Sequence, residues 1–127
     1  MDEPVVFISR WRLVTDRQTW RVAYRAVNEA IAAAKPRTSV FAAYLDEEAA
    51  ETRIVHVFSD AAAMAEHFVG SAERSGSASD LITPLGFEVY GAAPAAAVEQ
   101  LEREAASAGV PVAVFPDAIG GFLRARA

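Results

Sequence analysis

The chain has 127 residues, a length that suits one domain able to bury about two thirds of the surface exposed by its unfolded form. With 53% hydrophobic and 23% charged residues it is not intrinsically disordered, and without cysteine it has no disulfide, thiolate nucleophile or cysteine-ligated metal. Its formal charge of −5, from 12 Lys and Arg against 17 Asp and Glu, argues against binding to nucleic acid.

A strand followed by a helix is predicted at the start of the chain. Residues 5–14 are rich in β-branched and aromatic side chains. Alternation along this strand places Phe7, Ser9, Trp11 and Leu13 on one face and Val6, Ile8, Arg10 and Arg12 on the other. Thr15 and Gln18 form a capping box, and apolar residues then recur every three to four positions until Lys35 and Pro36 end the helix.

The next two strands are predicted at residues 38–45 and 53–58, joined by the acidic stretch 46–51. Because the connection is short, we expect the two strands to pair in the antiparallel sense.

A second helix and a fourth strand follow. Ser59 and Asp60 cap the helix, which runs to about Gly70. Residues 71–79 are rich in Ser, Gly and charge and predict a mobile loop. The fourth strand is expected at residues 85–91.

The C-terminal part predicts one more helix and one more strand. Pro94 suits the first turn of a helix that Gly109 ends. Val112–Phe115 lies between Pro111 and Pro116, which confines it to a strand at the edge of a sheet.

The order β-α-β-β-α-β over residues 5–91 is the ferredoxin-like pattern, to which residues 92–127 add a helix and an edge strand. We therefore predict a single α+β domain over residues 1–127. In such a unit both helices cover one face of the sheet, while Val55 and Val57 make the other face apolar. We expect a second copy of the chain to cover that face, giving a homodimer.

This pattern resembles the dimeric α/β-barrel superfamily, and within it the antibiotic-biosynthesis-monooxygenase-like proteins. The similarity covers residues 5–91 and is most specific at residues 55–60 (VHVFSD) and 65–68 (AEHF). These stretches are similar to the family's strand ending in an aromatic residue, followed by Ser-Asp or Glu-Ser, and to a helix with an Ala-His pair nine positions after the aromatic. The resemblance implies a homodimer whose sheets close into a barrel, with a pocket between each subunit's sheet and helices.

Several activities are implied by this resemblance: cofactor-free oxygenation of polyphenols, haem degradation, polyketide cyclisation, lactone isomerisation and ligand binding. Oxygenating members usually have Trp at the position of Phe58 and Asn at that of Ile54. Haem-degrading members have Asn at Ser9, Trp at His67 and a His near Ser77. Because this chain differs at each of these positions, neither set of catalytic residues transfers to it.

His56 and His67 are the candidate catalytic residues. His56 is in phase with Phe58 on the strand face expected to look toward the helices, so it points into the pocket or packs as an ordinary core histidine. His67 lies on the second helix, either as an acid or base at the rim of the cleft or as a half-exposed helical residue. No nearby carboxylate has the spacing of a metal site, so we predict no metal.

Aromatic and polar residues on the expected inner surface could bind a flat ligand or simply form a core. The predicted substrate-binding residues are Phe7, Ser9, Trp11, Tyr44, Phe58 and Met64. Arg17, Arg21 and Arg25 form a ridge on the first helix, which could attract an acidic ligand but fits a solvated helix face better in an acidic chain.

We therefore predict an antibiotic-biosynthesis-type monooxygenase that acts without a bound cofactor on an aromatic or polyketide-like molecule. The alternatives are a non-catalytic binding or dimerisation module and a polyketide cyclase or isomerase. An enzyme should keep an open pocket that contains a polar group, whereas a structural dimer should fill it with Trp11, Phe58 and Met64. No phosphate-binding glycine loop, apolar membrane span or secretory start is found, so we expect no nucleotide cofactor, no membrane partner and a cytoplasmic location.

Overall fold

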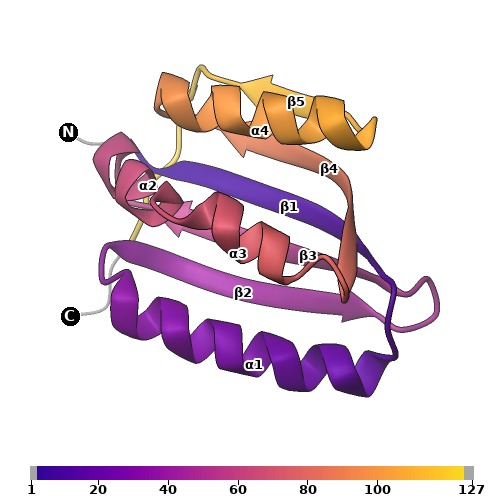
Figure 1. Ribbon diagram of the computed structural model, residues 1–127. Helices are drawn as coiled ribbons and strands as arrows, with labels where there is room; N and C mark the ends of the chain where they lie inside the picture. The colour runs from indigo at the N-terminus through magenta and orange to yellow at the C-terminus, as the bar shows by residue number, and fades with distance from the viewer. Residues whose placement is uncertain (1–2, 125–127) are drawn as a thin grey trace.

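A computed structural model describes residues 3–124 as one sheet with helices packed against it (Figure 1). In chain order the elements are β1 (Val5–Leu13), α1 (Arg17–Ala34), β2 (Thr38–Asp46), β3 (Glu51–Phe58), α2 (Ala61–Phe68), α3 (Ser71–Ser77), β4 (Ile82–Tyr90), α4 (Ala95–Ala108) and β5 (Val112–Phe115).

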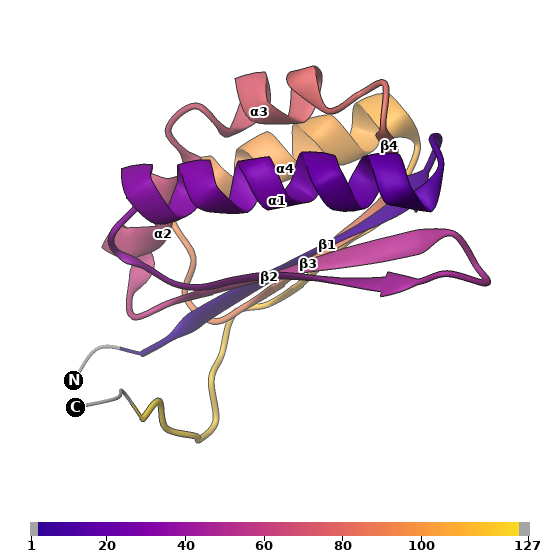
Figure 2. The ribbon, with the colours of Figure 1, turned by 90° about the horizontal axis from the view of Figure 1, so that it is seen from below.

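The strands lie in the order β2-β3-β1-β4-β5, and all neighbours are antiparallel except β4 and β5, which are parallel. This arrangement confirms the predicted α+β, ferredoxin-like fold with an added helix and edge strand. The edge strand pairs with β4 of its own chain. The four helices of residues 3–124 all lie on one side of the sheet, and no helix of these residues covers the other side (Figure 2).

The alternation predicted for β1 is confirmed. Phe7 and Trp11 are buried under the helices, whereas Val6 and Ile8 on the open face are only partly covered. Pairing of Phe7 with His56 continues the buried row onto β3. Strand alternation therefore decides which side chains of β1 and β3 reach the space beneath the helices.

The predicted cap of α1 is wrong by one residue. The carboxylate of Asp16 caps this helix by accepting hydrogen bonds from the backbone N–H of Thr19, at 2.8 Å, and from its hydroxyl group, at 2.6 Å. Thr15 and Gln18 therefore do not form the capping box. Aspartate is as good an N-cap residue as threonine, and here the start of the helix selects the second of the two adjacent candidates.

The loop predicted at residues 71–79 is mostly the short helix α3, none of whose residues is buried. Gly70 starts it with a φ of +83°, in the left-handed region that favours glycine. Polar composition alone predicted a loop, but a short helix of about two turns can lie over other elements without an apolar face of its own.

The fourth strand begins at Ile82, three residues before its predicted start. A register shift between Arg10 and Trp11 of β1 accommodates an irregularity in β4, and Pro84 lies within this stretch. Proline is tolerated there because β5 pairs only with residues 87–90, so β4 has a free edge at Pro84.

The uncovered sheet face carries Val6, Ile8, Val55 and Val57, which are partly exposed. After β5 the chain runs off on the side of the sheet opposite the helices (Figure 2). Three apolar side chains of this segment are exposed: Ile119, Phe122 and Leu123. None of the helices within residues 3–124 is long and apolar enough to cross a membrane.

Candidate functional site

A cavity of about 420 Å³ lies between the sheet and the helices. Its floor is formed mainly by Phe7, Ser9, Trp11, Ile54, His56 and Phe87. Helix α1 forms one side, α4 contributes Leu101 and Glu104, and α3 lies over the cavity on the side away from the sheet (Figure 2). The cavity is therefore mostly aromatic and aliphatic, with a few polar groups, as is typical of small-molecule sites.

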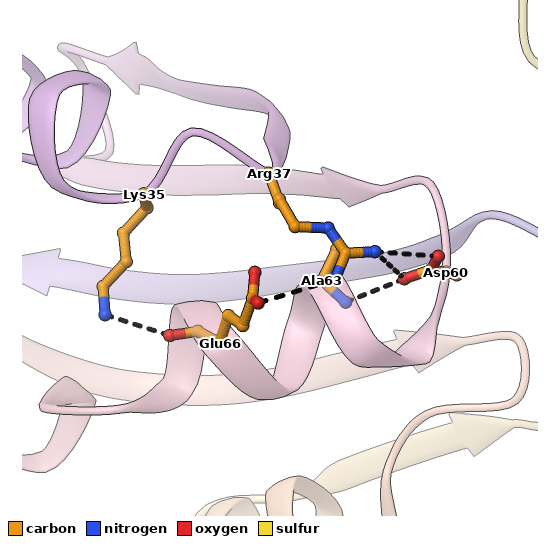
Figure 3. A network of polar contacts seen from close by, with 5 residues as sticks. All are labelled: Lys35, Arg37, Asp60, Ala63 and Glu66. Carbon is orange, nitrogen blue, oxygen red and sulfur yellow. Dashed lines mark hydrogen bonds and ion pairs between the residues drawn. The ribbon is translucent and has the colours of Figure 1, made fainter.

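The connection between α1 and β2 holds helix α2 in place over the cavity (Figure 3). Lys35 Nζ donates a hydrogen bond to the carbonyl oxygen of Glu66, at 2.9 Å, in the last turn of α2. Arg37 donates to both carboxylate oxygens of Asp60, each at 3.0 Å, and Asp60 accepts the N–H of Ala63 as the N-cap. Positive charge at its C-terminal end and a carboxylate at its N-terminal end both stabilise α2.

His56 is buried in the cavity floor with a defined tautomer. Its Nδ1 lies 3.0 Å from the carbonyl oxygen of Phe7. Because a carbonyl oxygen can only accept, Nδ1 carries the proton and Nε2 of the neutral ring is free to accept one. Burial is the main cause that lowers the pKa of His56 to about 4, so the ring is neutral at neutral pH.

His67 is only 3% exposed, so the alternative of a half-exposed helical residue is wrong, and the residue lies inside the cavity rather than at its rim. Its Nδ1 lies 2.7 Å from the hydroxyl oxygen of Thr38, and its ring centroid is 5.2 Å from that of His56. Burial is the main cause that lowers the pKa of His67 to about 3. Repulsion from a positive charge on His56, and then from Arg74, lowers it further. The two rings form a neutral, nearly perpendicular pair that lines the cavity.

Arg74 and Glu104 line the cavity as well, and sequence reasoning did not identify either. Arg74 extends from α3 and donates to the carbonyl oxygens of His67, at 2.6 Å, and Val69, at 3.1 Å. Burial raises the pKa of Glu104 on α4. Arg74 was missed because its helix was interpreted as a loop. For Glu104 a signal was available, because it lies three residues after the buried Leu101 and so near the same face of α4.

The six predicted substrate-binding residues divide into two groups. Phe7, Ser9 and Trp11 line the cavity, and Ser9 Oγ accepts a hydrogen bond from Trp11 Nε1 at 2.7 Å. Three others lie elsewhere and were wrongly predicted as walls of this cavity: Tyr44, Phe58 and Met64.

Register and depth explain the misplaced residues. Tyr44 pairs with Arg53, on the row that faces away from the helices, and is 66% exposed. Phe58 and Met64 are fully buried in the core at the end of β3 and the start of α2. They therefore do not fill the cavity, which stays open and contains polar groups.

No group of three His, Asp or Glu side chains that could hold a metal ion is found within residues 3–124. The cavity's titratable side chains instead include two neutral imidazoles, one guanidinium and two carboxylates, and Ser9 adds a hydroxyl group in the floor: His56, His67, Arg74, Glu73 and Glu104. Such a set can move protons and pair with an anionic ligand.

Comparison with known proteins identifies relatives by structure alone. No protein-family model matches the sequence, and no curated protein is significantly similar to it. Among solved structures, MupZ from Pseudomonas fluorescens has 19% identity and a TM-score of 0.67, over 97% of this chain and 96% of its own.

Two further structures match the core of the chain. SnoaB, a cofactor-independent oxygenase from Streptomyces nogalater, has 14% identity and a TM-score of 0.56, over 68% of this chain and 90% of its own. A protein from Bacteroides thetaiotaomicron, provisionally assigned as an antibiotic biosynthesis monooxygenase, has 17% identity and a TM-score of 0.51, over 64% of this chain and 81% of its own. The chain therefore has the ferredoxin-like fold of the antibiotic-biosynthesis-monooxygenase-like proteins.

Proposed function

We propose that the protein binds an aromatic or polyketide-like small molecule in the cavity between sheet and helices and oxygenates it without a bound cofactor. The observation that carries this proposal is the aromatic cavity with His56 in its floor, neutral and with Nε2 unprotonated. The structural likeness to SnoaB supports the same class of reaction.

The chemistry starts with a proton transfer. His56 Nε2 accepts a proton from an acidic hydroxyl group or activated C–H group of the substrate. Arg74 lies close enough to both histidines to disfavour their protonation, and the same positive charge stabilises the substrate anion. That anion supplies the electrons to dioxygen, so that an activated CH₂ group and O₂ give a carbonyl group and water.

The test is oxygen consumption with a panel of anthrone-like and flavin-like compounds, after mass spectrometry of any molecule that co-purifies. His56→Gln should lower the rate by about 10²-fold or more, because the amide cannot act as a base. Binding without oxygen uptake by the wild-type protein would refute oxygenation and leave a binding module.

A cyclase or isomerase is the second candidate, favoured by Glu104. A carboxyl group whose pKa is raised by burial can donate a proton, while neutral His56 can accept one. Such an enzyme converts its substrate equally well without oxygen. Anaerobic turnover that Glu104→Gln slows would therefore favour this candidate over oxygenation.

A homodimer completes this proposal. A second copy would cover the partly apolar sheet face and give Phe115 and the exposed apolar residues of 119–123 a surface to pack against. Light scattering at micromolar concentration should report a dimer, and Val57→Lys on the open face should weaken it. A monomeric wild-type protein would refute this arrangement.

A further inference from the structure

A second hollow, of about 560 Å³, lies between helix α1 and the free edge of β2. Strand β2 pairs only with β3, so its other edge faces this hollow. The residues that give the hollow its character are Trp20, Tyr24, Arg25, Asn28 and Phe41. It therefore combines aromatic surface with hydrogen-bond donors, and it is distinct from the cavity that holds the two histidines.

The arginine ridge of α1 ends in this hollow. Arg17 Nε donates to the carbonyl oxygen of Glu47 at 2.8 Å, and Arg21 forms an ion pair with the Glu47 carboxylate. Arg25, one helical turn further on, lines the hollow and has neither an ion pair nor a side-chain hydrogen bond within residues 3–124. One guanidinium group is thus available to a ligand, in a chain whose net charge is −5.

Tyr24 and Asn28 extend the donor set. The hydroxyl group of Tyr24 donates to Asn28 Oδ1 at 3.2 Å, so the amide nitrogen of Asn28 has its N–H groups available. Burial raises the pKa of Tyr24 to about 12, which keeps the phenol neutral. An anion in the hollow therefore meets donors from Arg25 and Asn28 and no negative charge from Tyr24.

The aromatic wall of the hollow is preformed. The rings of Tyr24 and Phe41 are nearly parallel, with centroids 5.7 Å apart and an interplanar angle of 14°. The ring centroid of Trp20 lies 5.7 Å from that of Tyr24. All three side chains also line the main cavity, so they form a partition between the two spaces.

We propose that the hollow between α1 and β2 is a second binding site, for a ligand that carries a carboxylate or phosphate group on an aromatic ring. The ring packs against Tyr24 and Phe41, and the anionic group pairs with the guanidinium of Arg25 and the amide of Asn28. Arginine binds both kinds of anion through two parallel N–H···O bonds. This site is independent of the oxygenation proposed for the main cavity.

The test titrates the protein with benzoate and with phenyl phosphate, using benzamide and inorganic phosphate as matched probes. Backbone NMR shifts should change at residues 24–28 and 41–45, with saturation at about millimolar concentration. Benzamide, which lacks the charge, should bind about 10-fold more weakly or worse. Inorganic phosphate should bind more weakly than phenyl phosphate, because it lacks the ring.

Two variants separate this site from general charge effects. Arg25→Gln should weaken binding of both aromatic anions about 10-fold. Arg103→Gln, an exposed arginine on α4, should leave it unchanged. Thermal unfolding would show that both variants fold.

Four results would overturn the proposal: no saturable binding, equal affinity for benzoate and benzamide, unchanged affinity in Arg25→Gln, or shift changes centred on His56 and Leu101. If inorganic phosphate bound as tightly as phenyl phosphate, the proposed packing of the ligand's ring against Tyr24 and Phe41 would be refuted. The relative affinities of benzoate and phenyl phosphate tell which anion the site prefers.

Discussion

In the floor of the main cavity, β1 and β3 are each hydrogen-bonded to strands on both sides, and their inward side chains are buried. The roof of the cavity is α3, which has no buried residue. Its polar ties include one between Gln100 Nε2 and Ser71 Oγ, at 2.5 Å, and those from Arg74 to carbonyl groups at the end of α2. The strands of the floor are therefore held in place by many buried contacts, whereas α3 is held by a few polar contacts near the surface.

Because of this difference, the floor determines the position of the reactive groups and the roof determines how a ligand reaches them. The floor fixes the position and tautomer of His56, because many buried contacts must break together before the strands move. The roof can open by breaking a few polar contacts near the surface, at little cost to the rest of the fold. Changes in the floor should therefore alter stability, and changes in the roof should alter exchange and access.

The largest effect is expected for Phe58→Ala in the core beside the floor. Phe58 is fully buried, so its truncation leaves a cavity and should lower the free energy of unfolding by about 3–5 kcal/mol. Tyr44→Ala, an exposed aromatic residue on the neighbouring β2, is the matched control and should change it by about 0.5 kcal/mol or less. Urea unfolding of both variants measures the contrast, and equal losses would contradict it.

The second prediction concerns pH. Both histidines have folded-state pKa values, about 4 and about 3, below the ordinary value of 6.5. The unfolded chain therefore binds more protons below pH 6.5, and stability should be complete above that pH and fall as the pH decreases. The loss is about 1.4 kcal/mol per pH unit for each histidine once the unfolded histidine is protonated.

Chemical unfolding between pH 5 and pH 8 tests this slope, above the range in which most carboxylates titrate. His67→Gln removes one titrating group. The number of protons taken up on unfolding, which sets the slope, should therefore fall by up to one. A slope that this variant does not change would show that His67 is not held neutral in the folded protein.

A smaller effect is expected for His67→Ala. The substitution removes a buried ring and leaves the Thr38 hydroxyl without its partner at 2.7 Å, so it should cost about 1–3 kcal/mol of stability. Thr38→Val and the double variant complete a mutant cycle, in which we expect the two costs not to add. Additive costs would indicate that the contact contributes nothing.

The smallest effect on stability is expected in the roof. Gln100→Ala breaks the contact with Ser71 and should change the free energy of unfolding by about 0.5 kcal/mol or less. Backbone amides of residues 71–77 should nevertheless exchange with solvent deuterium faster than those of β1, and faster still in the variant. Exchange of α3 as slow as that of β1 would show that the roof is as firmly held as the floor.

Local patterns predicted most elements of the fold. The alternation around Phe7 and Trp11 fixed the inward face of β1, and proline on both sides of Val112–Phe115 correctly placed that strand at an edge. Helix α3 was not predictable in this way. It has no apolar stripe, and it forms over a cavity that other elements create.

Candidate site residues were predictable to the extent that strand alternation governs them. His56 and Ser9 could be placed on the inward face because their strands carry clear apolar rows. Arg74 was not predictable because it lies on α3, which has no buried residue and no apolar stripe. The spacing of Glu104 after the buried Leu101 places it near the inner face of α4, but spacing alone does not show that a cavity lies there.

The sequence by itself determined the order of the strands and main helices, their inward faces and the presence of two histidines near the end of β3 and on α2, because these follow from spacing along the chain. Only the tertiary structure decided that those histidines are buried together, that the cavity stays open and that α3 covers it. These features depend on contacts between residues 29 to 49 positions apart, such as those of His67 with Thr38 and His56 with Phe7, which no local pattern encodes.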